Sequence, residues 1–144
     1  MYRLRSEASF DSAHFLKGYD GKCSNMHGHR WRVVAEIGAE TLIESGHLEG
    51  MIVDFGDLKG DLKALADDLD HKIIYQKGTL KETTLACFKD EGFDVYEVQG
   101  RPTAEHMSKF FYDALKLKGY HVVRVEVFET PTNSAVYEEV ARHV

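Results

Sequence analysis

The sequence has 144 residues, enough for one domain with a single hydrophobic core. Hydrophobic residues make up 43% and charged residues 29%, which excludes a disordered or fibrous chain, and no apolar run approaches the roughly 20 residues that span a bilayer. The formal net charge of −6 argues against a nucleic-acid partner, and two cysteines, too few for a disulfide framework, indicate a cytoplasmic protein with free thiols.

The first part of the chain predicts a β-hairpin. Residues 3–14 alternate between apolar and polar side chains, and residues 27–37 do the same, which is typical of antiparallel strands with one buried face. The polar connector between them, residues 17–25, contains Gly18 and Gly21 and favours a turn.

The remainder predicts helices followed by two more strands. Leucines at 58, 62, 65 and 69 form the apolar stripe of a helix that ends near residues 70–71. Residues 79–91 favour a second helix ended by Gly92, and residues 93–98 a short strand or extended loop. Thr103 is the N-cap of a third helix, whose buried stripe we expect at Met107, Phe110, Phe111, Ala114 and Leu117. Strands at residues 123–129 and 135–140 complete an α+β fold.

Three histidines are predicted to meet at the turn of the hairpin. His14 ends the first strand, His27 and His29 begin the second, and by strand parity all three lie on the apolar face. Three neutral imidazoles with an open fourth position are typical of a catalytic zinc site. A lone histidine on an apolar face is usually a hydrogen-bonded core residue, but three polar rings at one point are costly without a shared partner. We therefore predict a metal site. Imidazole also suits iron and copper, and zinc is the preference.

Cys23 lies in the connector, four residues before His27, and its spacing leaves three interpretations open. It is an incidental exposed thiol, a base or nucleophile beside the metal, or a fourth metal ligand that would close the open position.

Two positions further along the chain carry polar side chains of chemical interest. Asp70 and His71 end the leucine-striped helix, and a solvated helix end is their simplest interpretation. Glu129 continues the apolar face of residues 123–127, where a carboxylate requires a cationic partner or a ligand rich in N–H groups.

Several short motifs occur in a fixed order: Phe10-Asp11-Ser12-Ala13-His14, Cys23-x-x-x-His27-Gly28-His29, Val53-Asp54-Phe55-Gly56-Asp57-Leu58, Leu69-Asp70-His71, Pro102-Thr103-Ala104-Glu105 and Glu129-Thr130-Pro131. Each motif alone is weak. The ordered set, which spans about residues 10–137, resembles the 6-pyruvoyl-tetrahydropterin synthase family, and most closely its bacterial 6-carboxy-5,6,7,8-tetrahydropterin synthase branch. The resemblance implies one tunnelling (T-) fold domain over residues 1–144, with a four-stranded antiparallel sheet and helices packed on one face. It also implies homotrimers stacked as homohexamers, with active sites between subunits.

The same resemblance implies roles for the site residues. Those that bind zinc are His14, His27 and His29; the catalytic residues are Cys23, Asp70 and His71; the substrate-binding residues are Glu129, Glu105 and Thr103. The Glu129 carboxylate would accept two parallel N–H donors from the pterin edge.

The family's substrate is 7,8-dihydroneopterin triphosphate. In the carboxy branch triphosphate and acetaldehyde are released and 6-carboxytetrahydropterin remains, on the way to 7-deazaguanine and queuosine; the pyruvoyl branch stops earlier. The short Cys-x-x-x-His-Gly-His spacing favours the carboxy branch. The alternatives are a pyruvoyl-type enzyme or a paralogue acting on another pterin, and a non-catalytic protein that binds metal and pterin.

Two features depart from the family pattern. His106 stands where the family usually has asparagine, which bears on the rim of the pocket. Residues 72–101 form a longer stretch than in compact members, which bears on the contacts between subunits.

Overall fold

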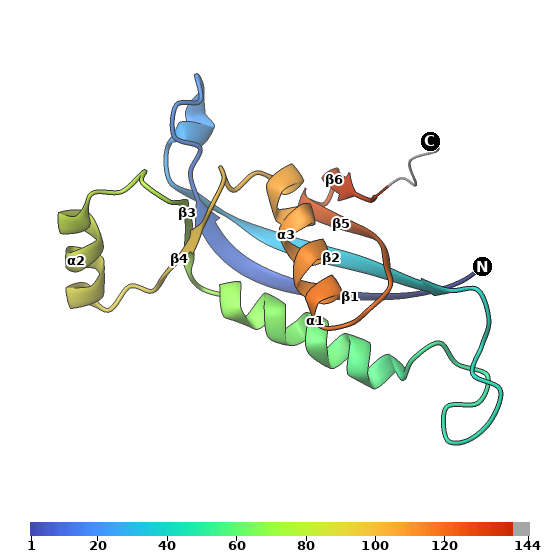
Figure 1. Cartoon of the computed structure of the whole chain (residues 1–144). Coiled ribbons are helices and arrows are strands. Elements are labelled where there is room, and N and C mark those ends of the chain that lie inside the picture. The colour runs from blue at the N-terminus through green and yellow to red at the C-terminus, as the bar shows by residue number, and fades with distance from the viewer. Residues whose placement is uncertain (140–144) are drawn as a thin grey trace.

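Two long strands form the centre of a curved sheet (Figure 1). In this computed structural model, which describes residues 1–139, β1 (Tyr2–His14) pairs antiparallel with β2 (His27–Ala39) along their whole length. The other strands are β3 (Ile73–Gln76), β4 (Val95–Val98), β5 (Val122–Thr130) and β6 (Asn133–Tyr137). The strand order is β4-β3-β1-β2-β5-β6.

The prediction of an α+β fold is confirmed, but the sheet has six strands among the described residues instead of four. β3 was not predicted, because four residues are too few to display a period. It runs parallel to β1 and pairs with it only at Ala13 and His14. The last strand ends at Tyr137 and does not continue as expected; of that predicted strand, Val140 lies outside the described residues.

Two helices cover one face of the sheet, α1 (Phe55–Leu69) and α3 (Ala104–Leu117) (Figure 1). The Asp54 carboxylate caps α1 by accepting a 2.6 Å hydrogen bond from the backbone N–H of Gly56. Thr103 caps α3 as predicted, with its hydroxyl oxygen accepting from the N–H of His106. The leucine stripe of α1 packs on the inner face of β1 and β2, where Phe10 and Trp31 are buried.

The buried stripe of α3 differs from the prediction: Met107 and Phe111 are buried, whereas Phe110 and Ala114 are only half-buried. Leu117 is 90% exposed, whereas Leu115 is fully buried. The helix places Met107, Phe111 and Leu115 on one line four residues apart, and this line faces the sheet. Leu117 lies to the side of that line, in the last turn, where no part of the sheet covers it.

A third helix, α2 (Glu82–Glu91), stands apart from the other two beside β3 and β4 (Figure 1). The helix expected at residues 79–91 is therefore confirmed with a later start, and it ends at Gly92, whose φ of 83° is left-handed. None of its residues is buried. Within residues 1–139 the structure has no helix with the length and apolar character that a membrane span requires.

Candidate metal and active site

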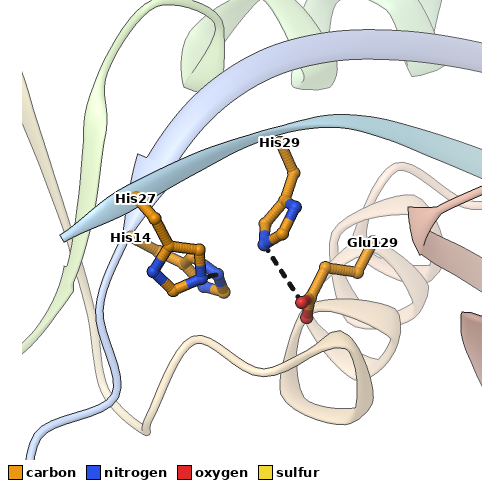
Figure 2. A group of neighbouring side chains, drawn as sticks. All are labelled: His14, His27, His29 and Glu129. Carbon is orange, nitrogen blue, oxygen red and sulfur yellow. Dashed lines mark hydrogen bonds and ion pairs between the residues drawn. The ribbon is translucent and has the colours of Figure 1, made fainter. Parts of the chain in front are cut away.

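The side chains of His14, His27 and His29, called the histidine group below, lie together at the end of the β1–β2 hairpin (Figure 2). The hairpin register pairs His14 with His27, and His29 with Ser12, so the three imidazoles project from one face, as strand parity predicts. The distances between ring centroids are 4.6 Å, 5.1 Å and 4.9 Å. The His14 side chain is fully buried, and the other two are half-buried.

Backbone carbonyl groups orient two of these rings. The Nδ1–H of His14 donates a 2.8 Å hydrogen bond to the carbonyl oxygen of Pro102. The Nδ1–H of His27 donates a 2.7 Å hydrogen bond to the carbonyl oxygen of Asn25. Because a carbonyl oxygen can only accept, the proton of each neutral ring resides on Nδ1 and the lone pair on Nε2. This is how proteins usually orient histidines that bind a metal through Nε2.

The ligand atoms of the histidine group lie close to one another. Nε2 of His14 and Nε2 of His27 are 3.1 Å apart, and with both Nδ1 atoms protonated their lone pairs face each other. Nε2 of His29 is buried and makes no hydrogen bond. The two facing lone pairs of His14 and His27 repel each other unless a cation lies between them, and the ligand atom of His29 lies within 4.8 Å of both, so the residues fit a metal ion.

Burial favours the neutral imidazoles that a metal requires. Desolvation lowers the pKa of His14 from 6.5 to about 4, and the charges of His27 and His29 act in the same direction. Desolvation also lowers the pKa of His29, although the Glu129 carboxylate opposes this shift. At neutral pH these two rings are therefore ready to bind a cation without first losing a proton.

Glu129 joins the histidine group from β5 (Figure 2). Its Oε1 lies 3.1 Å from Nε2 of His29, in a direction that makes an ion pair possible but not a hydrogen bond. The four ligand atoms all lie within 4.8 Å of one another. The Glu129 carboxylate on the apolar strand face thus has a polar neighbour. Its chemistry allows Glu129 to bind either a metal or a substrate.

Cys23 lies in a short 3-10 helix, Lys22–Ser24, within the loop between β1 and β2. Its thiol is free and half-buried. The group of ligand atoms within reach of one metal contains Glu129 and not Cys23, so the fourth position of the histidine group is not filled by sulfur.

Asp70 and His71 form a hydrogen-bonded pair at the edge of β1. The Asp70 carboxylate accepts the backbone N–H of Asp11 through Oδ1 and Nδ1–H of His71 through Oδ2, each at 2.8 Å. These bonds lower the pKa of Asp70, that to Asp11 most strongly, and the bond to Asp70 raises the pKa of His71. His71 has a φ of 58°, a left-handed conformation that is strained for a residue with a Cβ. The backbone N–H of His71 donates to the carbonyl oxygen of Asp11, which helps to hold that conformation.

The remaining predicted residues lie at the start of α3. The Thr103 hydroxyl caps the helix, and Glu105 is exposed in its first turn. Side-chain patterns do not reveal one group here, the carbonyl of Pro102, because a backbone acceptor carries no sequence signal of its own.

The sequence model of the 6-pyruvoyl tetrahydropterin synthase family matches residues 3–140. The chain belongs to this family. This match confirms the family predicted from the ordered motifs. The matched residues include the histidine group and Glu129, and the family consists of pterin-processing enzymes.

Curated relatives within the family match most of the chain. A 6-carboxy-5,6,7,8-tetrahydropterin synthase of Haemophilus influenzae is 35% identical over 142 residues, which is 96% of this chain and 100% of that protein. A protein of the same name from Aquifex aeolicus is 34% identical over 128 residues, 82% of this chain and 76% of that protein.

Solved structures show the same fold at lower identity. An uncharacterized protein of Wolinella succinogenes matches with a TM-score of 0.78 and 22% identity, covering 96% of this chain and 98% of that one. The 6-pyruvoyl tetrahydropterin synthase of Plasmodium vivax matches with a TM-score of 0.72 and 21% identity, covering 96% and 97%.

Proposed function

We propose that this protein is a zinc-dependent 6-carboxy-5,6,7,8-tetrahydropterin synthase. It converts 7,8-dihydroneopterin triphosphate to 6-carboxytetrahydropterin, with release of acetaldehyde and triphosphate, as a lyase in 7-deazaguanine and queuosine biosynthesis. The observation that carries the proposal is the convergence of three oriented imidazoles on one point, in a chain whose relatives in Haemophilus influenzae and Aquifex aeolicus bear this enzyme's name. Two free cysteines favour a cytoplasmic location, where thiols stay reduced.

The histidine group would hold the metal through its Nε2 atoms, and the carbonyl oxygens of Pro102 and Asn25 would keep two of the rings in place. A bound divalent ion supplies Lewis acidity toward the hydroxyl groups of the substrate side chain. Glu129 would anchor the pterin by accepting its parallel N–H donors, in hydrogen bonds strengthened by the negative charge. Thr103 and Glu105 complete the proposed substrate-binding set at the start of α3.

Proton transfer would fall to Cys23 and to the Asp70–His71 pair. The Cys23 thiolate takes a proton from the substrate side chain. His71 donates its Nδ1–H to Asp70, which leaves Nε2 as the atom that delivers a proton to the substrate. The hydrogen bond to Asp70 and the charge of that carboxylate favour the protonated form of the ring and so prepare it to act as the acid.

We propose further that the active sites lie between subunits of a homotrimer or homohexamer. Asp70 and His71 are bound at the edge of β1 beside Asp11, whose side chain lies on the face opposite His14 by strand parity. A neighbouring copy can bring this pair to Cys23. Among the described residues, positions 2–10 of β1 pair only with β2, and β6 pairs only with β5. Unpaired edges of this kind favour pairing with another chain.

The experiment that tests the activity incubates the zinc-loaded protein with 7,8-dihydroneopterin triphosphate and identifies the products by mass. Carboxytetrahydropterin and acetaldehyde are expected. A pyruvoyl-pterin would assign the pyruvoyl-type reaction instead, and tight binding without turnover would make the protein a non-catalytic homologue.

The two cysteines provide a matched pair of variants. Cys23→Ala should lower turnover by roughly 10²-fold or more, the usual contribution of a general base, and leave metal binding intact. Cys87→Ala, which changes the exposed thiol on α2, should keep full activity. Full turnover by Cys23→Ala would remove Cys23 from the mechanism but leave the metal site unaffected.

Mixing two inactive variants tests the proposed position between subunits. Cys23→Ala and His71→Ala chains should each be inactive alone. In a cyclic oligomer that is unfolded and reassembled from equal amounts, about a quarter of the sites would combine both intact residues from neighbouring chains. Absence of any recovered activity in mixed oligomers would place both residues in the same chain's site.

A further inference from the structure

Arg101 forms a hydrogen bond between two separate segments of the candidate site. It lies just before Pro102, whose carbonyl oxygen accepts the hydrogen bond from His14. The guanidinium Nη2 of Arg101 donates a 2.7 Å hydrogen bond to the carbonyl oxygen of Lys17. Lys17 belongs to the segment of residues 15–26 between β1 and β2, called the Cys23 loop below (Figure 1).

The Cys23 loop has a backbone shape that admits the guanidinium. Gly18, next to Lys17, has a φ of +85°, and a Cβ at this position would lie 3.3 Å from Nη2 of Arg101. A side chain here would be strained by the left-handed backbone and would crowd the guanidinium. The glycine therefore permits both the turn and the close approach of Arg101.

The segment that carries Arg101 is also contacted by His106. A Cβ on Gly100 would lie 2.7 Å from both Cε1 and Nδ1 of the His106 ring, so the imidazole packs directly on the backbone of Gly100. His106 is fixed in turn, because its N–H donates to the hydroxyl of Thr103 at the start of α3. Residues 100–102 are thus bound by the His106 ring, by the Cys23 loop and by His14. This contact gives the unusual His106 a structural reason.

The Cys23 loop also reaches the histidine group at its other end. The carbonyl oxygen of Asn25 accepts the hydrogen bond from Nδ1 of His27. Within the loop, the N–H of Leu16 donates to the carbonyl oxygen of Cys23, and the N–H of Asn25 to that of Lys22. Each end of the loop is therefore linked to one histidine, through Asn25 to His27 and through Arg101 and Pro102 to His14.

We infer that Arg101 is a positioning residue that couples the metal centre to the loop carrying Cys23. Arginine suits this position because its guanidinium stays charged and offers several fixed donors, so one of them can bind a carbonyl oxygen at any working pH. The inference rests on the proposed function only for the part that Cys23 plays in turnover. The coupling itself is a property of the fold and the metal, and it can be measured without substrate.

Amide hydrogen exchange of the full-length protein, with and without zinc, tests the coupling. The variants are Arg101→Ala, Arg101→Lys and, as a control, Arg5→Ala, which removes an exposed arginine from the distant part of β1. The amide of Leu16 donates to the carbonyl oxygen of Cys23, and that of Tyr19 to the carbonyl oxygen of Leu16. In Arg101→Ala both amides should exchange roughly two- to tenfold faster, the range expected for one lost hydrogen bond. Zinc should slow both amides in the parent and in Arg5→Ala, but much less in Arg101→Ala. Asn25 should respond to zinc in every variant, because its link to His27 is intact.

Arg101→Lys keeps a charged donor and should restore part of the zinc-dependent slowing at Leu16 and Tyr19. The lysine variant therefore tests the coupling even if the alanine variant folds poorly. Equal zinc-dependent slowing of Leu16 and Tyr19 in the parent and in both Arg101 variants would overturn the inference. If the exchange results are as expected and turnover exists, Arg101→Ala should lower kcat about tenfold or more with little change in KM, since small misplacements of reacting groups are costly. If the exchange results are as expected but no protein turns over the pterin, the proposed function fails and the coupling stands.

Discussion

A divalent metal ion should stabilise the folded protein, and loss of one imidazole should abolish the effect. The convergent Nε2 atoms of the histidine group exist only when β1 and β2 are paired, so the ion binds the folded state and not the unfolded chain. Such binding raises the free energy of unfolding by about 2.7 kcal/mol when free metal is 100 times the Kd. An unfolding entropy of about 2.1 cal/mol/K per residue gives about 0.3 kcal/mol/K for the whole chain, so the melting temperature should rise by about 9 °C.

The assay is thermal unfolding of the metal-free protein, followed by circular dichroism, with and without zinc. His27→Ala removes a ligand that is only half-buried, so the variant should fold and its melting temperature should stay unchanged on adding zinc. His47→Ala, which changes an exposed histidine in the loop before α1, should keep the full shift. An equal shift in His27→Ala and in the parent, or no shift in the parent, would refute the assignment of the histidine group as the metal site.

Four other substitutions test the same structure. Asp70→Asn removes the carboxylate whose hydrogen bond and charge raise the pKa of His71 above 6.5. Because the proposed acid must be protonated, turnover falls as pH rises through that pKa, and the variant should move this fall to lower pH in a pH–rate profile; an unmoved profile would contradict the role of His71. Glu129→Gln should raise KM for the pterin about ten- to a hundredfold, the value of hydrogen bonds to a charged group, with metal affinity unchanged; weaker metal binding at constant KM would instead make Glu129 a metal ligand. Leu115→Ala should lower the free energy of unfolding in urea by about 2–5 kcal/mol and Leu117→Ala by no more than about 0.5 kcal/mol, because only Leu115 is buried; similar losses would mean that α3 is rotated.

The hairpin and its histidines could be predicted because their signal is long and local. Alternation over more than ten residues in each strand determines which side chains share a face, and a single connector makes the strands antiparallel. The convergence of His14 with His27 and His29 at the turn follows from those two facts. The cap of α3 belongs to the same class, since a cap depends on residues within one turn.

The parts that could not be predicted depend on contacts between distant segments. The approach of Glu129 to His29 requires the pairing of β2 with β5, and the bond from His14 to Pro102 requires the segment before α3 to cross the end of the hairpin. β3 is held by two neighbouring strands and has almost no pattern of its own. The exposure of Leu117 depends on how α3 lies on the sheet, which a helical period alone does not determine. Two expectations stay predictions. One is that residues 1–144 form a single domain, and the other is that residues 72–101 form a longer stretch than in compact members of the family.

The hydrogen bond between His14 and Pro102 has a consequence for the order in which the protein matures during synthesis. All three imidazoles have been made once β2 leaves the ribosome, yet the acceptor that orients His14 follows it by 88 residues. A nascent chain therefore contains the three imidazoles long before it can orient the ring of His14. High affinity for the ion should arise late in translation, after most of the polypeptide has been assembled.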